Sequence, residues 1–159
     1  MDRSLIERYA GGAGAVLDSI EGLSREQLDA VPVPGKWSVR QLAVHLLDSD
    51  MVGTDRMKRV AAQPRPLIIG YDENLWLRNL PIARLDIRRV GELFRLNREL
   101  TAEMLRALPD ESFARDGVHN ERGLVTLGGL VEDYVGHLEH HMRFMQAKLA
   151  ALGVRSGSR

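Results

Sequence analysis

The sequence contains no cysteine among its 159 residues. A disulfide framework, a thiolate nucleophile and a zinc site built on cysteines are therefore excluded. Any metal ion that this chain binds must rest on histidine, aspartate or glutamate. Chemistry that uses a thiol would need the thiol to arrive with a substrate.

Neither an excess of charge of one sign nor a long apolar run is present. Lysine plus arginine number 22, and so do aspartate plus glutamate. No global field favours nucleic acid or an anionic membrane, so we expect neither as a partner and expect a small-molecule substrate instead. The first residues, MDRSLIERYAGGAG, lack the apolar core of a leader, and no stretch approaches the roughly 20 apolar residues of a spanning helix. The expected compartment is the cytoplasm.

Aromatic residues make up only 5% of the chain. Few segments alternate with the period of two that is typical of strands, and helical periodicity dominates. The length suits one domain with a core of its own. We therefore predict a single helical domain over residues 1–153, followed by a flexible tail over residues 154–159.

Four long helices are predicted from periodicity and from start and stop signals. They cover about residues 4–20, 38–62, 86–108 and 126–152. Ser38 and Gln41 have the spacing of a capping box at the start of the second helix, and Thr126 is the natural N-cap of the fourth. The sequence thus predicts an all-α four-helix bundle. Residues 110–125 are expected to form a polar loop.

The connection between the second and third helices, residues 63–85, is long enough to cover one end of the bundle. Its stretch YDENLW is predicted to add a short helix capped by Asp72. Tyr71 and Trp76 are candidates for lining a substrate entrance. The alternative for Trp76 is that it packs the connection onto the bundle.

Three of the five histidines lie close together in VEDYVGHLEHHMRFM. His137 and His141 are four residues apart, so on a helix they share one face, whereas His140 points away from it. This spacing is common among metal ligands, but two imidazoles make an incomplete site. The residue after His137 is Leu138, so the HEXXH pattern of metalloproteases is absent. From spacing alone, a polar edge of the helix is the favoured interpretation.

A third ligand is available in the second helix. His45 lies within WSVRQLAVHLLDSD, at a position whose direction the periodicity does not settle, and a structural role is the alternative to a ligand. Asp48, three residues on, is suited to orient it or to supply an oxygen ligand, unless it is a solvated carboxylate. His119 falls in the polar loop, where we expect it to be exposed.

Three segments together resemble the DinB-like (YfiT-like) family. WSVRQLAVHLLDSD resembles its second-helix signature, in which Trp-Ser is followed by a histidine inside the helix. GLVTLGGLVEDYVGHLEHHMRFM resembles its last helix, where Gly-x-x-Thr leads into an H-x-x-H-H cluster. YDENLW resembles its middle segment. Each motif is weak alone, but the set spans the chain from about Gly35 to Met145 and is fairly specific.

The resemblance implies a four-helix bundle with one divalent metal ion, often zinc or nickel, held by three histidines. The matching positions are His45, His137 and His141. His140 matches an extra histidine that is not a usual ligand. A branch of mycothiol-dependent isomerases has a glutamate at one last-helix position, so this chain is nearer the all-histidine branch. Members commonly form homodimers, which we expect here as well.

The family includes bacillithiol-type S-transferases and proteins described only as metal-dependent hydrolases. Three neutral imidazoles leave a metal ion its full charge and open positions, where an incoming thiol loses its proton. We therefore predict a thiol-dependent S-transferase acting on small electrophiles. A hydrolase in which water replaces the thiol and a non-catalytic metal-binding stress protein are the alternatives. Asp48 and His140 are candidate catalytic bases, and no spacing argument selects between them.

Overall fold

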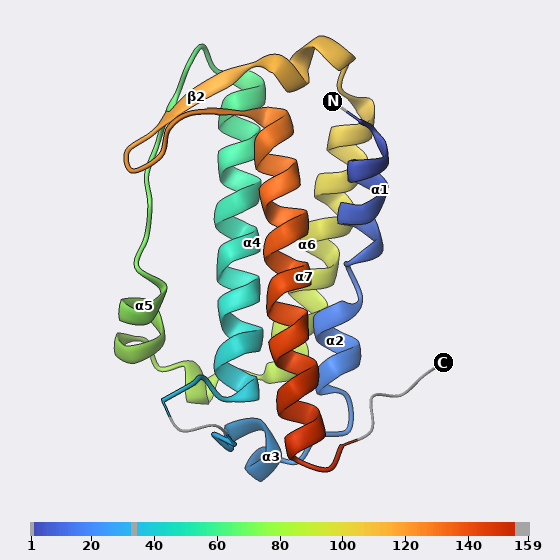
Figure 1. The fold of residues 1–159 in the computed structure, drawn as a ribbon, viewed down its shortest axis with the longest axis vertical. Coiled ribbons are helices and arrows are strands. Elements are labelled where there is room, and N and C mark those ends of the chain that lie inside the picture. Colours follow the sequence, from blue (N-terminus) through green and yellow to red (C-terminus); the bar gives the residue numbers. More distant parts are fainter. Residues whose placement is uncertain (1, 33–34, 155–159) are drawn as a thin grey trace.

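The computed structural model describes residues 2–32 and 35–154 and is built on four long helical rods (Figure 1). The rods are α1 (Ser4–Gly11) continued by α2 (Ala15–Ile20), then α4 (Val39–Ala62), α6 (Ile87–Ala107) and α7 (Leu127–Ala151). α4 packs against both α6 and α7, and α1 and α2 close the bundle from the other side. The predicted four-helix bundle is confirmed. Among the helices of the described residues, none has both the length and the apolar composition of a membrane span.

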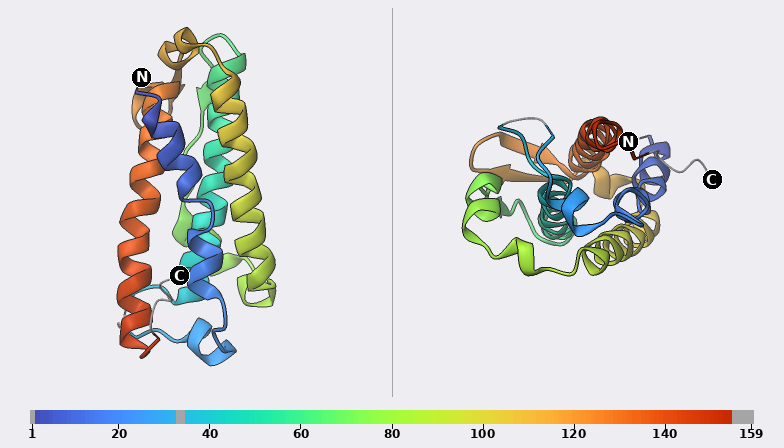
Figure 2. Two further views of the ribbon diagram at one scale, coloured as in Figure 1. Left: turned by 90° about the vertical axis from the view of Figure 1, so that its right-hand side faces the viewer. Right: turned by 90° about the horizontal axis from the view of Figure 1, so that it is seen from below.

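The shorter elements lie at the ends and on one side of the bundle. They are α3 (Arg25–Asp29), α5 (Glu73–Asn79), the 3-10 turns Ile82–Arg84 and Asp110–Ala114, and the strands β1 (Leu67–Ile68), β2 (Asp116–His119) and β3 (Gly123–Thr126). Seen from below in Figure 2, α5 and the strands lie on the outer side of α4. The long connection therefore runs along the side of the bundle as well as over its end.

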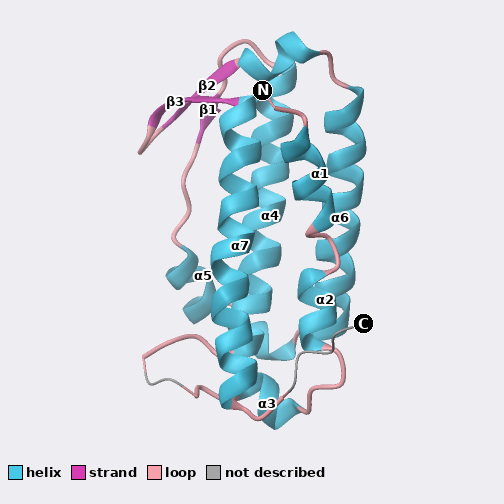
Figure 3. Ribbon diagram, turned by 45° about the vertical axis from the view of Figure 1, so that its right-hand side comes forward, coloured by secondary structure: helices cyan, strands magenta, loops and turns pink. Residues whose placement is uncertain are grey.

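A small three-stranded sheet replaces the polar loop expected at residues 110–125 (Figure 3). β2 and β3 form an antiparallel hairpin, and β1 from the long connection pairs with β2 in parallel. Gly123 closes the hairpin with a φ of 75°, a conformation that glycine adopts without strain. The expectation of a loop was wrong because residues 116–126 form a hairpin, and the strand that completes the sheet, β1, comes from the long connection, which local signals do not indicate.

The first predicted helix, over residues 4–20, is broken into α1 and α2 at Gly12 to Gly14. A Cβ atom on Gly12 would collide with the side chains of Leu138 and Arg98. The backbone at Gly12 therefore packs directly against side chains of α6 and α7. The interruption of the helix thus falls where Gly12 packs against the neighbouring helices.

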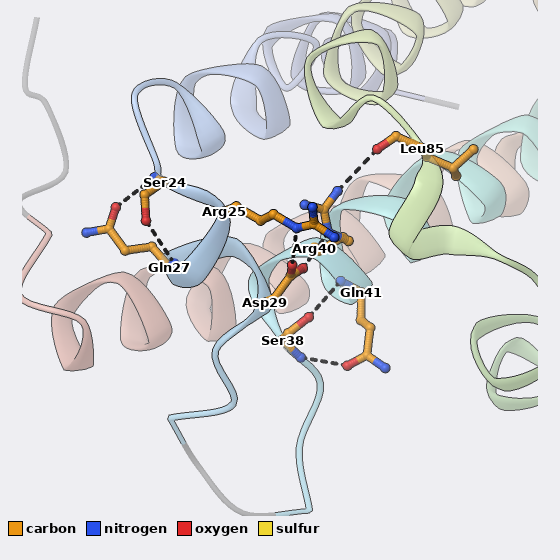
Figure 4. Close-up of polar contacts among 8 residues, drawn as sticks. All are labelled: Ser24, Arg25, Gln27, Asp29, Ser38, Arg40, Gln41 and Leu85. Atoms are coloured by element: carbon orange, nitrogen blue, oxygen red, sulfur yellow. Dashed lines mark hydrogen bonds and ion pairs between the residues drawn. The ribbon is translucent and has the colours of Figure 1, made fainter.

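Side-chain caps begin the helices at the predicted residues. Ser38 and Gln41 form a reciprocal capping box, with hydrogen bonds of 2.8 and 3.1 Å, at the start of α4 (Figure 4). Two residues on, Arg40 donates to the Asp29 carboxylate of α3 and to the Leu85 carbonyl. The start of α4 is thus tied to two other segments, which fixes the direction of side chains in its next turns.

The core consists of two apolar clusters separated by a polar layer. One cluster includes Leu42 and Phe94, and the other includes Met57 and Leu105. Between them, a buried network joins the helices, and its members are Tyr9, Asp50, Thr54, Asn97, Arg98 and Thr101. Because buried polar groups are costly when unpaired, this layer restricts how far the helices can slide past one another.

Nothing in the structure tests the predicted bounds of the domain, residues 1–153, so they stay a prediction. Val154 closes the last turn, where its backbone N–H donates to the carbonyl of Leu149 over 2.9 Å. The remaining residues of the predicted tail, 155–159, lie outside the described residues.

Candidate metal centre

Three histidines from two helices meet at one point between α4 and α7. His45 lies two turns after the capping box of α4, and His137 and His141 lie on successive turns of α7. The Nε2 atom of His45 is 3.2 Å from Nε2 of His137 and 3.3 Å from Nε2 of His141. They form the one group of three or more potential metal-ligating side chains found within the described residues.

Burial keeps all three imidazoles neutral. His45 is only 5% exposed, and the other two are partly buried. Burial, followed by the charge of neighbouring imidazoles, lowers the pKa of His45, His137 and His141 from 6.5 to about 4. Near neutral pH each ring therefore carries one nitrogen with a free lone pair, which is the form that binds a metal ion.

The nitrogen separations fit a small divalent ion. A tetrahedral ion with metal–nitrogen bonds of about 2.0–2.1 Å holds its nitrogen ligands about 3.3 Å apart. Hydrogen bonds between the rings account for this arrangement less well. Each Nε2 atom offers either one proton or one lone pair, so Nε2 of His45 can form a hydrogen bond with only one of its two neighbours. The donor set therefore suits a cation that takes a lone pair from each ring.

Trp37 holds two of the imidazoles by packing. Its indole lies 4.7 Å from the ring of His45 and is stacked on His141 at 6.0 Å with 15° between the planes. The Nδ1 atoms of His45 and His141 are buried and have no hydrogen-bond partner among the described groups. Ring packing thus does the orienting that a hydrogen bond to Nδ1 commonly does in metal sites.

His140, the extra histidine, lies outside this cluster. It is exposed, its ring contacts Phe144 at 4.8 Å, and its Nδ1 is 3.3 Å from Nη2 of Arg143. It also contacts the outer side of His141, with 5.3 Å between the ring centroids. His140 therefore lies beside the candidate ligand His141, but its ring points away from the histidine cluster, as its position on the helix predicted.

Asp48, Tyr71 and Trp76 come together in a cavity of about 400 Å³ between α4 and the long connection. Burial raises the pKa of Asp48 to about 6, so it is not the fully solvated carboxylate that the sequence allowed. Burial also raises the pKa of Tyr71 to about 12. The rings of Tyr71 and Trp76 pack together at 4.6 Å. Trp76 thus both packs within the connection and lines a cavity, although none of the three histidines lines that cavity.

Two further cavities adjoin the histidines directly. The larger, of about 490 Å³ and called here the lysine cavity, is lined by His141, Trp37, Leu42, Phe144, Lys36 and Lys148. The smaller, of about 290 Å³ and called here the arginine cavity, is lined by His137, Ser49, Arg56, Arg122, Asp133 and Tyr134. One cavity has largely apolar walls and the other polar walls, so the histidine cluster lies between two different environments.

The arginine cavity was not foreseen from the sequence. Arg56 donates to the hydroxyl of Tyr134 over 3.1 Å and to the carbonyl of Ile69 over 2.9 Å. Arg122 forms an ion pair of 2.7 Å with Asp133. The four side chains come from α4, the hairpin and α7. The only signal for them in the sequence is the position of Tyr134 one turn before His137.

His119, which was expected to be exposed, is only 4% exposed. It ends β2, and its Nδ1 accepts a hydrogen bond of 3.2 Å from the backbone N–H of Glu121. The expectation was wrong because it assumed a loop where the chain forms a hairpin. His119 lies outside the histidine cluster and plays no part in it.

A four-helix bundle that gathers three neutral imidazoles from two of its helices belongs to the class of metal-binding helical bundles. Within that class, this chain is a member of the DinB superfamily, whose profile matches residues 11–145. The resemblance noted in the sequence is therefore confirmed.

Proteins of Bacillus subtilis and Oceanobacillus iheyensis have similar sequences. The protein of Bacillus subtilis named "Putative metal-dependent hydrolase YfiT" is 32% identical over 126 residues, which cover 78% of this chain and 70% of YfiT. A protein of Oceanobacillus iheyensis that bears the same designation is 31% identical over 129 residues, which cover 79% of this chain and 72% of the relative.

Two solved structures have the same fold. The structure of Bacillus subtilis YfiT, described as an unusual four-helix bundle, superposes with a TM-score of 0.88 and 26% identity over 96% of this chain and 87% of YfiT. A DinB-like protein of Bacillus subtilis, YjoA, superposes with a TM-score of 0.68 over 96% of this chain and 94% of its own, and at 14% identity it shares the fold alone.

Proposed function

We propose that this chain is a metal-dependent enzyme in which His45, His137 and His141 hold one divalent ion, zinc or nickel. The observation that carries the proposal is the meeting of three Nε2 atoms, with two separations of 3.2 and 3.3 Å. When bound, the ion supplies Lewis acidity that favours the deprotonated form of an incoming thiol or water. The protein contributes neutral ligands and two cavities beside them.

The reaction proposed first is transfer of a low-molecular-weight thiol to a small electrophile. The sulfur forms a bond to the electrophilic carbon, the leaving group departs with the bonding electrons, and the thiol proton passes to solvent. Such a reaction brings two substrates together, and two cavities of different polarity adjoin the histidines. Arg56 and Ser49 suit a hydrophilic thiol, whereas Trp37 and Phe144 suit a carbon skeleton. Because the chain has no cysteine, the thiol must be a substrate.

The test begins with elemental analysis of protein purified without a histidine tag. We expect about one divalent ion per chain. His45→Ala and His141→Ala should lose it, whereas His140→Ala, the neighbouring exposed histidine, should keep it. Conjugation of cysteine, glutathione or bacillithiol with chlorodinitrobenzene should then follow the metal content. Wild-type protein without stoichiometric metal would overturn the proposal.

Metal-dependent hydrolysis is the second candidate, and Asp48 is the observation that favours it. Asp48 follows His45 by one turn of α4, although it lines the neighbouring cavity, and with a pKa raised to about 6 its carboxylate is ionised near neutral pH and suited to accept a proton from metal-activated water. Relatives of this chain carry the word hydrolase in their names. Turnover of nitrophenyl esters without thiol, lost in both His45→Ala and Asp48→Asn, would support hydrolysis over transfer. Bound metal with neither activity would support the third alternative, a non-catalytic metal-binding stress protein.

We also propose that the protein is a homodimer in the cytoplasm. Leu93, Leu96 and Leu100 are exposed on α6 and offer an apolar face for a second copy. A chain without cysteines gains nothing from an oxidising compartment. Light scattering on the eluted protein tests the first point, because a mass near 17.8 kDa, that of one chain, would contradict a dimer.

A further inference from the structure

The lysine cavity contains two of the chain's three lysines. Lys36 precedes α4, Lys148 is on α7, and both line the cavity, whereas the remaining lysine, Lys58, is exposed elsewhere on α4. Apart from the five histidines, all the other basic residues of the chain are arginines. The gathering of two lysines at one cavity beside a candidate metal ligand is therefore a distinct feature of the site.

Neither lysine is neutralised within the described part of the chain. Neither Lys36 nor Lys148 takes part in any ion pair or side-chain hydrogen bond found there, and no aspartate or glutamate lines the cavity. Lys148 is only 7% exposed. Burial, followed by the nearby charge of Lys36, lowers the pKa of Lys148. Two ammonium groups that repel one another beside an apolar wall are stabilised by an anion placed between them.

The rest of the cavity is apolar and aromatic. Its walls include Trp37, Leu42 and Phe144, a large and half-exposed aromatic residue. The volume of about 490 Å³ falls in the range of pockets that bind small organic molecules. Walls of this kind favour an apolar body over a fully polar anion such as phosphate.

Lys148 and His141 lie at different heights along the wall of the cavity that α7 forms. Lys148 lies seven residues after His141, so it occupies the same face of α7 two turns further on, about 10 Å along the helix. A ligand with its anionic group at the lysines can therefore extend its other end to His141. The orientation places the apolar body against Trp37 and Phe144.

We infer that the lysine cavity binds an amphipathic organic acid, with its carboxylate between Lys36 and Lys148 and its apolar body directed toward His141. In the proposed transferase, this acid is the electrophilic substrate, and the thiol arrives through the arginine cavity. The assignment of the acid as substrate rests on the proposed function. Binding of the acid depends only on the cavity.

The test uses Trp37 as its own reporter. In metal-loaded Trp76→Phe protein, Trp37 is the single tryptophan, so its emission reports on ligands in the lysine cavity. Octanoate should change this emission saturably, octanol should bind at least about tenfold more weakly, and succinate should have no effect. Charged hydrogen bonds of ordinary strength account for at least this ratio.

Methionine variants test whether octanoate affinity depends on the charge of the lysines or on their bulk. Lys36→Met and Lys148→Met keep a flexible apolar side chain, and together they should lower octanoate affinity at least about tenfold, to the level of octanol. Lys58→Met is the matched control and should bind octanoate as the parent does. Lys36 is exposed, so Lys36→Met should fold and its octanoate affinity can be measured even if Lys148→Met does not fold.

The inference is overturned if octanol binds as tightly as octanoate, or if Lys36→Met and the double variant keep full affinity. Metal content, measured on the same samples, separates this result from the proposed function. Protein that holds metal but does not distinguish octanoate from octanol refutes the acid site alone. Protein that binds octanoate through the lysines but holds no metal refutes the metal-dependent reaction and leaves the acid site standing.

Discussion

The carboxylate of Asp50 on α4 accepts a hydrogen bond of 3.0 Å from Nε of Arg98 on α6 in the middle of the bundle. Their side chains are only 4% and 1% exposed. Arg98 also donates from Nη2 to the backbone carbonyl of Tyr134 on α7, over 2.8 Å. One guanidinium therefore links three helices, two of which carry the metal-site histidines.

Replacing Arg98 by methionine should destabilise the fold strongly. The substitution leaves the Asp50 carboxylate buried without its cation and the Tyr134 carbonyl without its donor. Breaking a buried pair in this way costs about 3–5 kcal/mol. Urea denaturation in the presence of a chelator measures the loss without a contribution from bound metal.

Arg95→Met is the matched control for this measurement. Arg95 lies on the same helix, but its ion pair with Glu99 is partly exposed to solvent. Such pairs contribute less than about 1 kcal/mol. If the two variants lost equal stability, the buried network would have no special role in holding the bundle together.

The helices could be predicted because their signals are local. The capping residues Ser38, Asp72 and Thr126 each accept a hydrogen bond from the backbone N–H three residues on, so the start of each helix is encoded in a few adjacent positions. The spacing of His137 and His141 is local for the same reason. These features needed no knowledge of the tertiary structure.

The features that were missed depend on contacts between distant segments. The break after α1 falls where Gly12 packs against Arg98, far along the chain. The sheet that buries His119 needs β1 from the connection beside β2. The meeting of His45 with α7 came from the family resemblance, because the periodicity of α4 left its direction open.

Trp37→Leu should weaken metal binding while leaving all three candidate ligands in place. The indole packs on the rings of His45 and His141, whose Nδ1 atoms have no hydrogen-bond partner in the described structure. Loss of an orienting neighbour commonly lowers metal affinity about tenfold or more. Competition with a zinc chelator measures this, and Trp76→Phe should behave as the wild type. Equal affinities in the two variants would show that Trp37 only anchors the helix.

The metal should stay bound at unusually low pH. The pKa of each of the three histidines is lowered from 6.5 to about 4, so protons compete for these nitrogens only as the pH falls toward 4. A site of unperturbed histidines would begin to lose metal as the pH falls through about 6.5. Dialysis at stepped pH, followed by elemental analysis, should show metal retained to about pH 5. Half-loss near pH 6.5 in protein that keeps its helical circular dichroism would contradict the lowered pKa values.

Gly53→Ala should destabilise the bundle although alanine favours helices. A Cβ atom at this position on α4 would lie 2.5 Å from the ring of Tyr134, and glycine is what lets that ring pack against the helix. Overpacking of this kind costs about 1–3 kcal/mol, which outweighs the propensity gain of about 1 kcal/mol. The displaced ring would also disturb the hydrogen bond from Arg56 to the Tyr134 hydroxyl and so reshape the arginine cavity.

Gly136→Ala provides the opposite case on α7, where a Cβ atom meets nothing within 4 Å. Here only the propensity term acts, so the variant should gain about 0.5–1 kcal/mol. We therefore expect urea denaturation to show a lower free energy of unfolding for Gly53→Ala and a higher one for Gly136→Ala. A higher free energy of unfolding in both variants would mean that the ring of Tyr134 moves aside at little cost. The position of Tyr134 in the wall of the arginine cavity would then not depend on Gly53.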